Sequence, residues 1–107
     1  MSLSKTPASV PVKPRRPEFD LRAALATDWL SGDPFKTAFF NALSLTFPIG
    51  EKYFIDSVRA FEDRISDPKL REDVRGFIGQ EATHRREHRN YNQLLGEARG
   101  YDDSAFQ

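Results

Sequence analysis

The sequence predicts an all-α fold in which two long helices form an antiparallel hairpin preceded by an extended N-terminal arm. Two observations lead to this prediction. Asp33 with Pro34, and again Asp67 with Pro68, join a residue that can cap free backbone amides to a proline suited to the first helical position. After each pair, apolar residues recur three and four positions apart, which is the period of one helix face.

The first of these starts predicts a helix over about residues 34–64. One of its faces carries a line of apolar side chains, namely Phe40, Leu43, Phe47, Phe54, Val58, Phe61 and Ile65. Pro48 and Gly50 interrupt this line, and both residue types bend or loosen a helix. We expect a local bend there that turns Glu51 toward the apolar line.

The second start predicts a helix over about residues 68–95, with Gly96 as its C-terminal stop. One face follows the alternating steps of four and three residues that packed helices use. This line consists of Leu70, Val74, Phe77, Glu81, His84, His88, Tyr91 and Leu95. We expect it to pack against the apolar line of the first helix.

The N-terminal segment is predicted to be an extended arm over residues 1–20, followed by a helical unit over residues 21–107. Four of the seven prolines lie in the arm, beside the basic residues Lys13, Arg15 and Arg16. A solvated or docked tail is favoured over a basic anchor for a partner. Residues 21–30 could form a short helix, in which Trp29 is expected to be a packing anchor rather than a ligand platform.

Composition excludes several classes of protein. The chain has 107 residues, which is room for one domain, and it lacks the cysteine needed for disulfides, zinc–thiolate sites and cysteine nucleophiles. Sixteen basic residues balance sixteen acidic ones, so charge gives no reason to expect a nucleic acid partner. No apolar run approaches the roughly 18 residues of a membrane span, and no secretory signal is evident. We therefore expect a soluble cytoplasmic protein.

Polar side chains interrupt the apolar line of the second helix where burial is costly. An ionised carboxylate without a partner costs several kcal/mol to bury, so Glu81 needs a salt bridge, a hydrogen-bond network or a metal cation. Glu81 and His84 are three residues apart and share a helix face. A Glu-x-x-His pair facing a single Glu on a neighbouring helix is the ligand pattern of ferritin-like di-metal bundles, which favours the metal.

Counting from the turn identifies the facing carboxylate. Glu51 lies fifteen residues before Ser66, and Glu81 lies fifteen after it. At about 1.5 Å per residue, both lie roughly 22 Å from the turn, so an antiparallel hairpin brings them level. Glu62 lies about 16 Å from that level by the same rise, which excludes it as a ligand.

Other polar residues near this position admit two interpretations each. His88, one turn beyond His84, could be a third ligand or could hold a ligand in place by a hydrogen bond, and the second is favoured. An isolated Glu-x-x-His also occurs by chance, and a histidine on an apolar face is often a satisfied core residue. The run Arg85, Arg86 and Arg89 could bind phosphate, but a solvated face paired with Glu87 is favoured.

Two stretches resemble a known family. FFNALSLTFPIGEKYFIDSVR at 39–59 and DPKLREDVRGFIGQEATHRREHRNYNQLL at 67–95 are similar to the bacterial family of predicted metal-dependent hydrolases. The strings FPxGE and QExxHxxxH are specific when they occur together at this separation. The resemblance implies a ferritin-like fold, metal-binding positions at Glu51, Glu81 and His84, and a place for His88 in the second motif.

The chain departs from that family in length. The resemblance implies a protein roughly twice as long or more, in which a later helix pair supplies another carboxylate–histidine motif. We therefore expect a truncated member, a fragment, or half of a ferritin-like four-helix bundle. Its partner would be a missing C-terminal half or a second copy of the chain, since a homodimer would bring two such ligand sets together.

Three functions fit these observations. The first is a metal-dependent hydrolase that acts on an unknown small molecule, with His88 as a catalytic proton shuttle. The second is a di-iron or di-manganese oxidase or oxygenase, and the third is a non-catalytic oligomerisation module. The expected cofactor is a divalent metal, iron, manganese or zinc, with iron favoured because the ligands are mixed carboxylate and imidazole.

Overall fold

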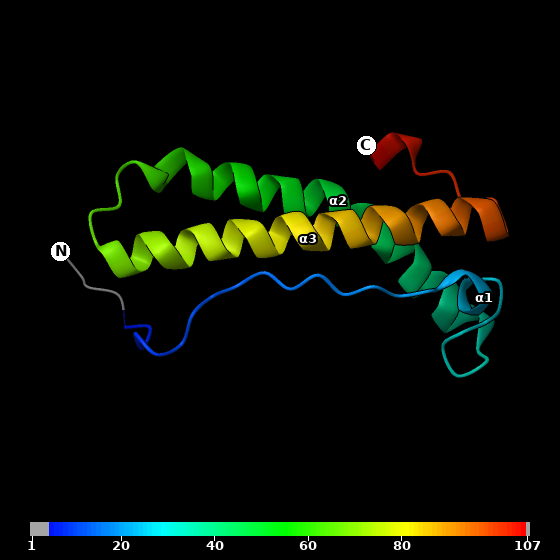
Figure 1. Cartoon of the computed structure of the whole chain (residues 1–107). Coiled ribbons are helices and arrows are strands. Elements are labelled where there is room, and N and C mark those ends of the chain that lie inside the picture. Colours follow the sequence, from blue (N-terminus) through cyan, green and yellow to red (C-terminus); the bar gives the residue numbers. More distant parts are fainter. Residues whose placement is uncertain (1–4, 107) are drawn as a thin grey trace.

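The structure is a computed structural model that describes residues 5–106, and its regular elements are all helical. Helix α1 spans Arg22–Leu25, α2 spans Pro34–Glu62 and α3 spans Pro68–Arg99. A short 3₁₀ turn, η1, spans Ser104–Phe106. Helices α2 and α3 pack against each other as an antiparallel hairpin (Figure 1), which confirms the predicted fold class. The first four residues of the predicted arm lie outside the described range.

Both long helices begin at the predicted caps. The Asp33 carboxylate accepts a hydrogen bond from the backbone N–H of Lys36 at 3.0 Å, and Pro34 follows as the first helical residue. The Asp67 carboxylate accepts from the backbone N–H groups of Lys69 and Leu70 at 2.9 and 3.2 Å. These bonds satisfy amides that have no partner inside the helix, so the two helix starts are fixed locally.

The predicted stop at Gly96 is wrong, because α3 continues through it to Arg99. The helix ends at Gly100, whose φ of 73° is left-handed and whose N–H donates to the Gly96 carbonyl at 3.1 Å. Gly96 has a different role. A Cβ there would lie 3.2 Å from the Tyr101 carbonyl oxygen, so glycine leaves room for the returning chain.

The helix predicted within residues 21–30 is only one turn long. Its Leu25 is buried, while the chain beyond it turns so that the Trp29 indole N–H can donate to the Asn41 side-chain oxygen at 2.9 Å. The Arg99 side chain donates to the Leu25 carbonyl and to Asp28, which fixes this turn against the end of α3. Trp29 is therefore bound to the hairpin through its polar edge.

The face of α2 that contacts α3 lies about one residue around the helix from the predicted apolar line. Its buried residues are Thr37, Asn41, Ser44, Leu45, Pro48, Glu51 and Ile55. Phe40, Phe47, Phe54 and Phe61 remain between 37% and 58% exposed, so the prediction that their line packs fully against α3 is wrong. Small polar residues occupy the contact because their groups can bond across it, and this leaves an aromatic face alongside.

Pro48 lies inside α2 without ending it. A proline has no N–H to donate to the carbonyl four residues earlier, which here belongs to Ser44. The Asn92 amide of α3 donates to that carbonyl instead, at 3.1 Å. The neighbouring helix thus supplies the missing hydrogen bond, so α2 continues through Pro48, and it changes direction where it passes behind α3 (Figure 1).

The described part of the arm lies along α3 (Figure 1), with α3 between it and the C-terminal half of α2 in this view. The Lys69 ammonium donates to the Val10 carbonyl at 3.2 Å, and the Gln80 amide donates to the Lys13 carbonyl at 3.4 Å. A Cβ on Gly76 would lie 1.9 Å from the Val12 oxygen. Only glycine therefore allows the arm to approach α3 this closely.

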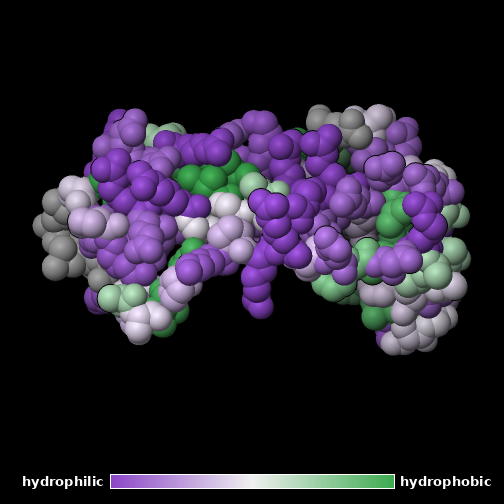
Figure 2. Space-filling model, in the orientation of Figure 1, coloured by the Kyte–Doolittle hydropathy of each residue, from purple (hydrophilic) through white to green (hydrophobic). Residues whose placement is uncertain are grey.

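The surface is largely polar on the face shown in Figure 2, where hydrophobic side chains are visible over α2 and near α1. No helix of residues 5–106 combines the length and the apolar character that a membrane crossing requires.

We expect Gly76→Ala to release the arm. Replacing glycine by alanine inside a helix normally stabilises the helix by about 1 kcal/mol. Here the added methyl group would collide with the Val12 backbone, and such overpacking costs about 1–3 kcal/mol. Trypsin should then cleave the Arg15–Arg16 bond faster than in the wild type, because the released arm is more accessible. This bond is the one to follow, since the bonds after Lys13 and Arg16 precede proline and resist trypsin.

Gly50→Ala is the matched control, since no atom lies within 4 Å of the added Cβ in the middle of α2. It should raise the free energy of unfolding and leave the cleavage rate unchanged. Equal stability and equal cleavage of the two variants would contradict a docked arm.

Candidate metal centre

Three side chains converge across the α2–α3 contact. Glu51 of α2 and Glu81 and His84 of α3 each offer a ligand atom, and these atoms all lie within 4.8 Å of one another. Glu51 is 7% exposed, Glu81 is half-buried and His84 is exposed, so the cluster has a buried end and an open end. Glu62 lies outside it, with its carboxylate 3.7 Å from Arg75.

The hairpin geometry explains this convergence. The caps at Asp33 and Asp67 fix where the helices start, and the short connection between them sets their relative level. Glu81 and His84 are three residues apart and project from one face of α3, with Glu81 Oε2 3.8 Å from His84 Nδ1. The level calculated from the turn therefore agrees with the position of Glu51.

His88 lies one turn further along α3 and faces Glu51. Its Nε2 is 3.7 Å from Glu51 Oε1, and its ring meets the Phe47 ring edge-on with centroids 4.6 Å apart. It is not among the three residues whose ligand atoms cluster. The Phe47 ring covers one side of the imidazole and keeps part of it out of water.

Ser44 and Asn92 determine which nitrogen of His88 carries the proton. The Ser44 hydroxyl donates to the Asn92 side-chain oxygen at 2.8 Å, so its single proton is already used. His88 Nδ1, 3.3 Å from the same hydroxyl oxygen, must then be the donor in that contact. The neutral ring is left with a free electron pair on Nε2, directed at Glu51.

Sequence reasoning did not identify Ser44 and Asn92 as part of this site. The available signal was weak: each is a small polar residue at a helix-face position that apolar residues also occupy. Their role depends on a contact between two helices, which spacing along one helix does not reveal.

Burial alters the acid–base properties of the site. The pKa of Glu51 is raised to about 7, first by burial and then by the negative charge of Glu81, while the Arg85 guanidinium acts in the opposite direction. Burial also lowers the pKa of His88, and the nearby His84 adds to this effect. Without a cation and below about pH 7, these groups therefore favour a protonated carboxyl group next to a neutral imidazole.

The donor set fits a divalent metal. Glu51 Oε2 is buried and has no hydrogen-bond partner among the described residues, so a carboxylate oxygen points at a position that lacks a compensating group. Two carboxylates and one imidazole together suit iron, manganese or zinc. A bound cation would satisfy the free oxygen and offset the repulsion between Glu51 and Glu81.

Two arginines of the basic run on α3, Arg85 and Arg86, differ in their contacts. Arg86 pairs with Glu87 at 2.8 Å, in agreement with the predicted solvated face. Arg85 behaves differently, since its Nε is buried without a hydrogen-bond partner in the described part of the chain.

The fold and the cluster define a helical protein with a carboxylate–histidine site of a kind that can bind a metal ion. The chain belongs to the family of predicted metal-dependent hydrolases, whose sequence model matches residues 13–107. This match confirms the family resemblance and extends it into the arm. No curated protein and no solved structure matches the chain.

We expect Glu51→Gln to change how stability depends on pH in the presence of a chelator. The folded-state pKa of Glu51, about 7, lies above its reference value of 4.5. The folded protein therefore binds this proton more tightly, so its contribution is fully present below pH 4.5 and is lost as pH rises through about 7. The loss is on the order of 3 kcal/mol.

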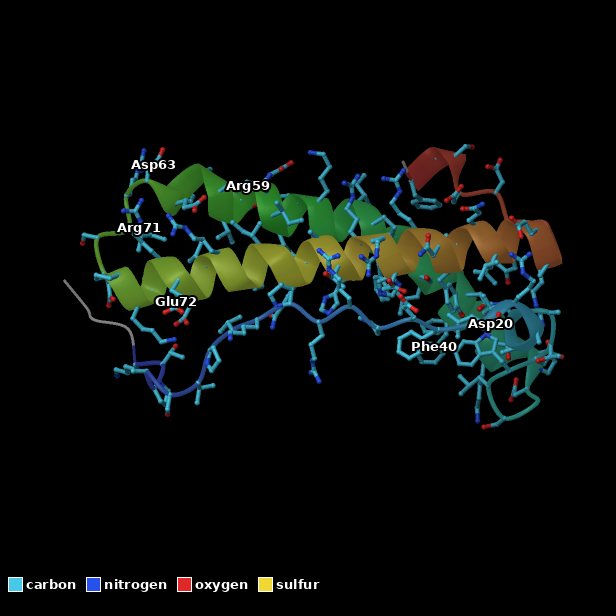
Figure 3. All side chains as sticks on the ribbon, in the orientation of Figure 1. Asp20, Phe40, Arg59, Asp63, Arg71 and Glu72 are labelled. Carbon is cyan, nitrogen blue, oxygen red and sulfur yellow. The ribbon has the colours of Figure 1, made fainter. Side chains whose placement is uncertain are left out.

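Urea unfolding at pH 5 and pH 8, with EDTA, measures this effect. Glu51→Gln has no such proton to lose, so its stability relative to the wild type should rise between the two pH values. Glu72→Gln, at an exposed carboxylate of α3 labelled in Figure 3, should follow the wild type. Parallel behaviour of Glu51→Gln and wild type would contradict the raised pKa.

Proposed function

We propose that this protein is a metal-dependent hydrolase acting on a small molecule, with a divalent metal held by Glu51, Glu81 and His84. The observation that carries the proposal is the buried Glu51 carboxylate, which has an unpartnered oxygen and offers a ligand atom within 4.8 Å of those of Glu81 and His84. Membership in the family of predicted metal-dependent hydrolases supports the same reading.

The metal would act as a Lewis acid and bring the pKa of a coordinated water toward neutrality. The two carboxylates would neutralise a divalent charge in a partly buried place, and the exposed side of His84 would leave the site open to substrate. His88 would accept a proton at Nε2, since its Nδ1 proton is held by Ser44. Iron is favoured over manganese and zinc because of the mixed ligands.

We further propose that a second copy of the chain completes the site as a di-metal centre of the ferritin-like type. The exposed aromatic face of α2 supports this, because Phe47 both belongs to that face and contacts His88. Covering the face with a second hairpin would bury the phenylalanines and bring a second set of Glu51, Glu81 and His84 close to the first.

Glu81→Ala should abolish metal binding. Wild-type protein loaded with Fe²⁺, Mn²⁺ or Zn²⁺ should retain about one ion per chain and unfold at a higher temperature than the chelated protein. Elemental analysis and thermal unfolding measure both quantities. Glu72→Ala removes a carboxylate from an exposed position of the same helix and should behave like the wild type.

The same proteins can be assayed for hydrolysis of p-nitrophenyl phosphate and p-nitrophenyl acetate. Activity should follow the metal in the wild type and Glu72→Ala, and should be absent from Glu81→Ala. His88→Gln should retain the metal and lose about a hundredfold in rate. A visible charge-transfer band with iron and O₂, without hydrolysis, would favour an oxidase instead. Metal content that is unaffected by Glu81→Ala would contradict both metal-dependent functions.

Phe54→Glu should dissociate the proposed dimer. Phe54 is 50% exposed on the aromatic face, and a carboxylate there would be buried without a partner in the dimer. Light scattering after gel filtration should report a dimer for wild type and a monomer for the variant. Phe35→Glu changes a residue that is 78% exposed at the start of α2 and should leave the dimer intact. A monomeric wild type would contradict the proposal.

A further inference from the structure

A large groove lies beside the α2–α3 contact, bounded at one end by η1. Its volume is about 970 Å³, and neither Glu51, Glu81 nor His84 lines it. On α2 it begins where Pro48 and Ile55 meet α3 and continues outward to Lys52 and Arg59. Figure 3 shows Arg59 on the α2 side of the hairpin, away from the arm. The aromatic face of α2 has no residue in this groove.

The groove has an excess of positive charge. Five cationic side chains line it against two carboxylates, those of Asp56 and Asp103. Lys52 pairs with Asp56, and Arg86 pairs with Glu87. The remaining cations, Arg59, Arg85 and Arg89, form no ion pair within residues 5–106.

Arg85 is the most informative of these three residues. Its Nε is buried and lacks a hydrogen-bond partner among the described residues, although it belongs to a guanidinium group that has only donors. A buried donor without an acceptor is costly, so an acceptor from outside the chain would satisfy it. Because Arg85 lines the groove, that acceptor would belong to the groove's occupant.

The uncharged part of the lining is mixed, with the amide side chains of Asn90, Asn92 and Gln93 beside an apolar wall. Leu45, Ile49, Ile55 and Phe106 line the same groove, so it can accommodate a hydrocarbon or aromatic body next to the guanidinium groups. The chain as a whole carries no net charge, which argues against a general attraction to polyanions. A bounded groove with charged and apolar walls fits a small amphiphilic anion.

We propose that this groove binds a small organic phosphate. Arg59, Arg85 and Arg89 contact the phosphate oxygens, for which a guanidinium offers two parallel donors, and Ile55 and Phe106 contact the apolar body. This site requires no metal and shares no lining residue with the metal cluster. It therefore goes beyond the proposed hydrolytic centre and can be tested without it.

Phenyl phosphate titrated into the full-length protein by calorimetry, with EDTA present, tests the proposal. Saturable binding is expected, and Arg59→Gln and Arg89→Gln should each weaken it by about tenfold. Both residues are exposed, so these variants should fold, which circular dichroism can verify. Arg75→Gln is the matched control, because Arg75 is an exposed α3 residue beside Glu62 and outside the groove. It should bind as the wild type does.

Four results would overturn the proposal. Absence of saturable binding, or equal weakening by Arg75→Gln, would mean that the groove has no specific phosphate site. Binding of phenol as tight as that of phenyl phosphate would remove the role of the arginines. Inorganic phosphate should bind more weakly than phenyl phosphate, and equal affinity would remove the role of the apolar wall. Glu81→Ala should bind phenyl phosphate normally, so a failed metal site and a failed groove give different results.

Discussion

The hydrogen bonds between Ser44 of α2 and Asn92 of α3 are the constraint on which the site depends. The Asn92 amide satisfies the carbonyl that Pro48 leaves without a donor, and its oxygen accepts the Ser44 hydroxyl proton. The Asn92 side chain thus replaces a hydrogen bond that α2 lacks, joins the two helices and, through Ser44, determines the tautomer of His88. Polar side chains at a helix contact are costly to bury, but the Ser44 hydroxyl and the Asn92 amide are hydrogen-bonded to each other's residues.

Sequence reasoning recovered the parts of the fold that depend on local chemistry. The caps at Asp33 and Asp67 need only neighbouring amides, so both helix starts could be predicted. The stop at Gly100 could not be separated from Gly96, because either glycine can adopt a left-handed conformation and the choice depends on where Tyr101 returns. The facing side of α2 was also misjudged, since hydrophobicity singled out the phenylalanines while the contact is made by polar residues.

The candidate site shows the same division. The level of Glu51 with Glu81 follows from counting residues along each helix from the turn, which is why that calculation was sufficient. The roles of Ser44 and Asn92, and the groove that contains Arg85, depend on how the helices are rotated about their axes. Rotation is set by side-chain packing across the contact, and no spacing within one helix encodes it.

The close approach of the arm to α3 has a consequence for the order of events during synthesis. Its contacts join Val10 to Lys69 and Lys13 to Gln80, residues separated by 59 and 67 positions. The arm is translated before α3, yet the surface at Gly76 on which it rests does not exist until α3 has been made and wound into a helix. A segment translated before both long helices thus reaches its final position only after them, and its prolines favour an extended chain in the meantime.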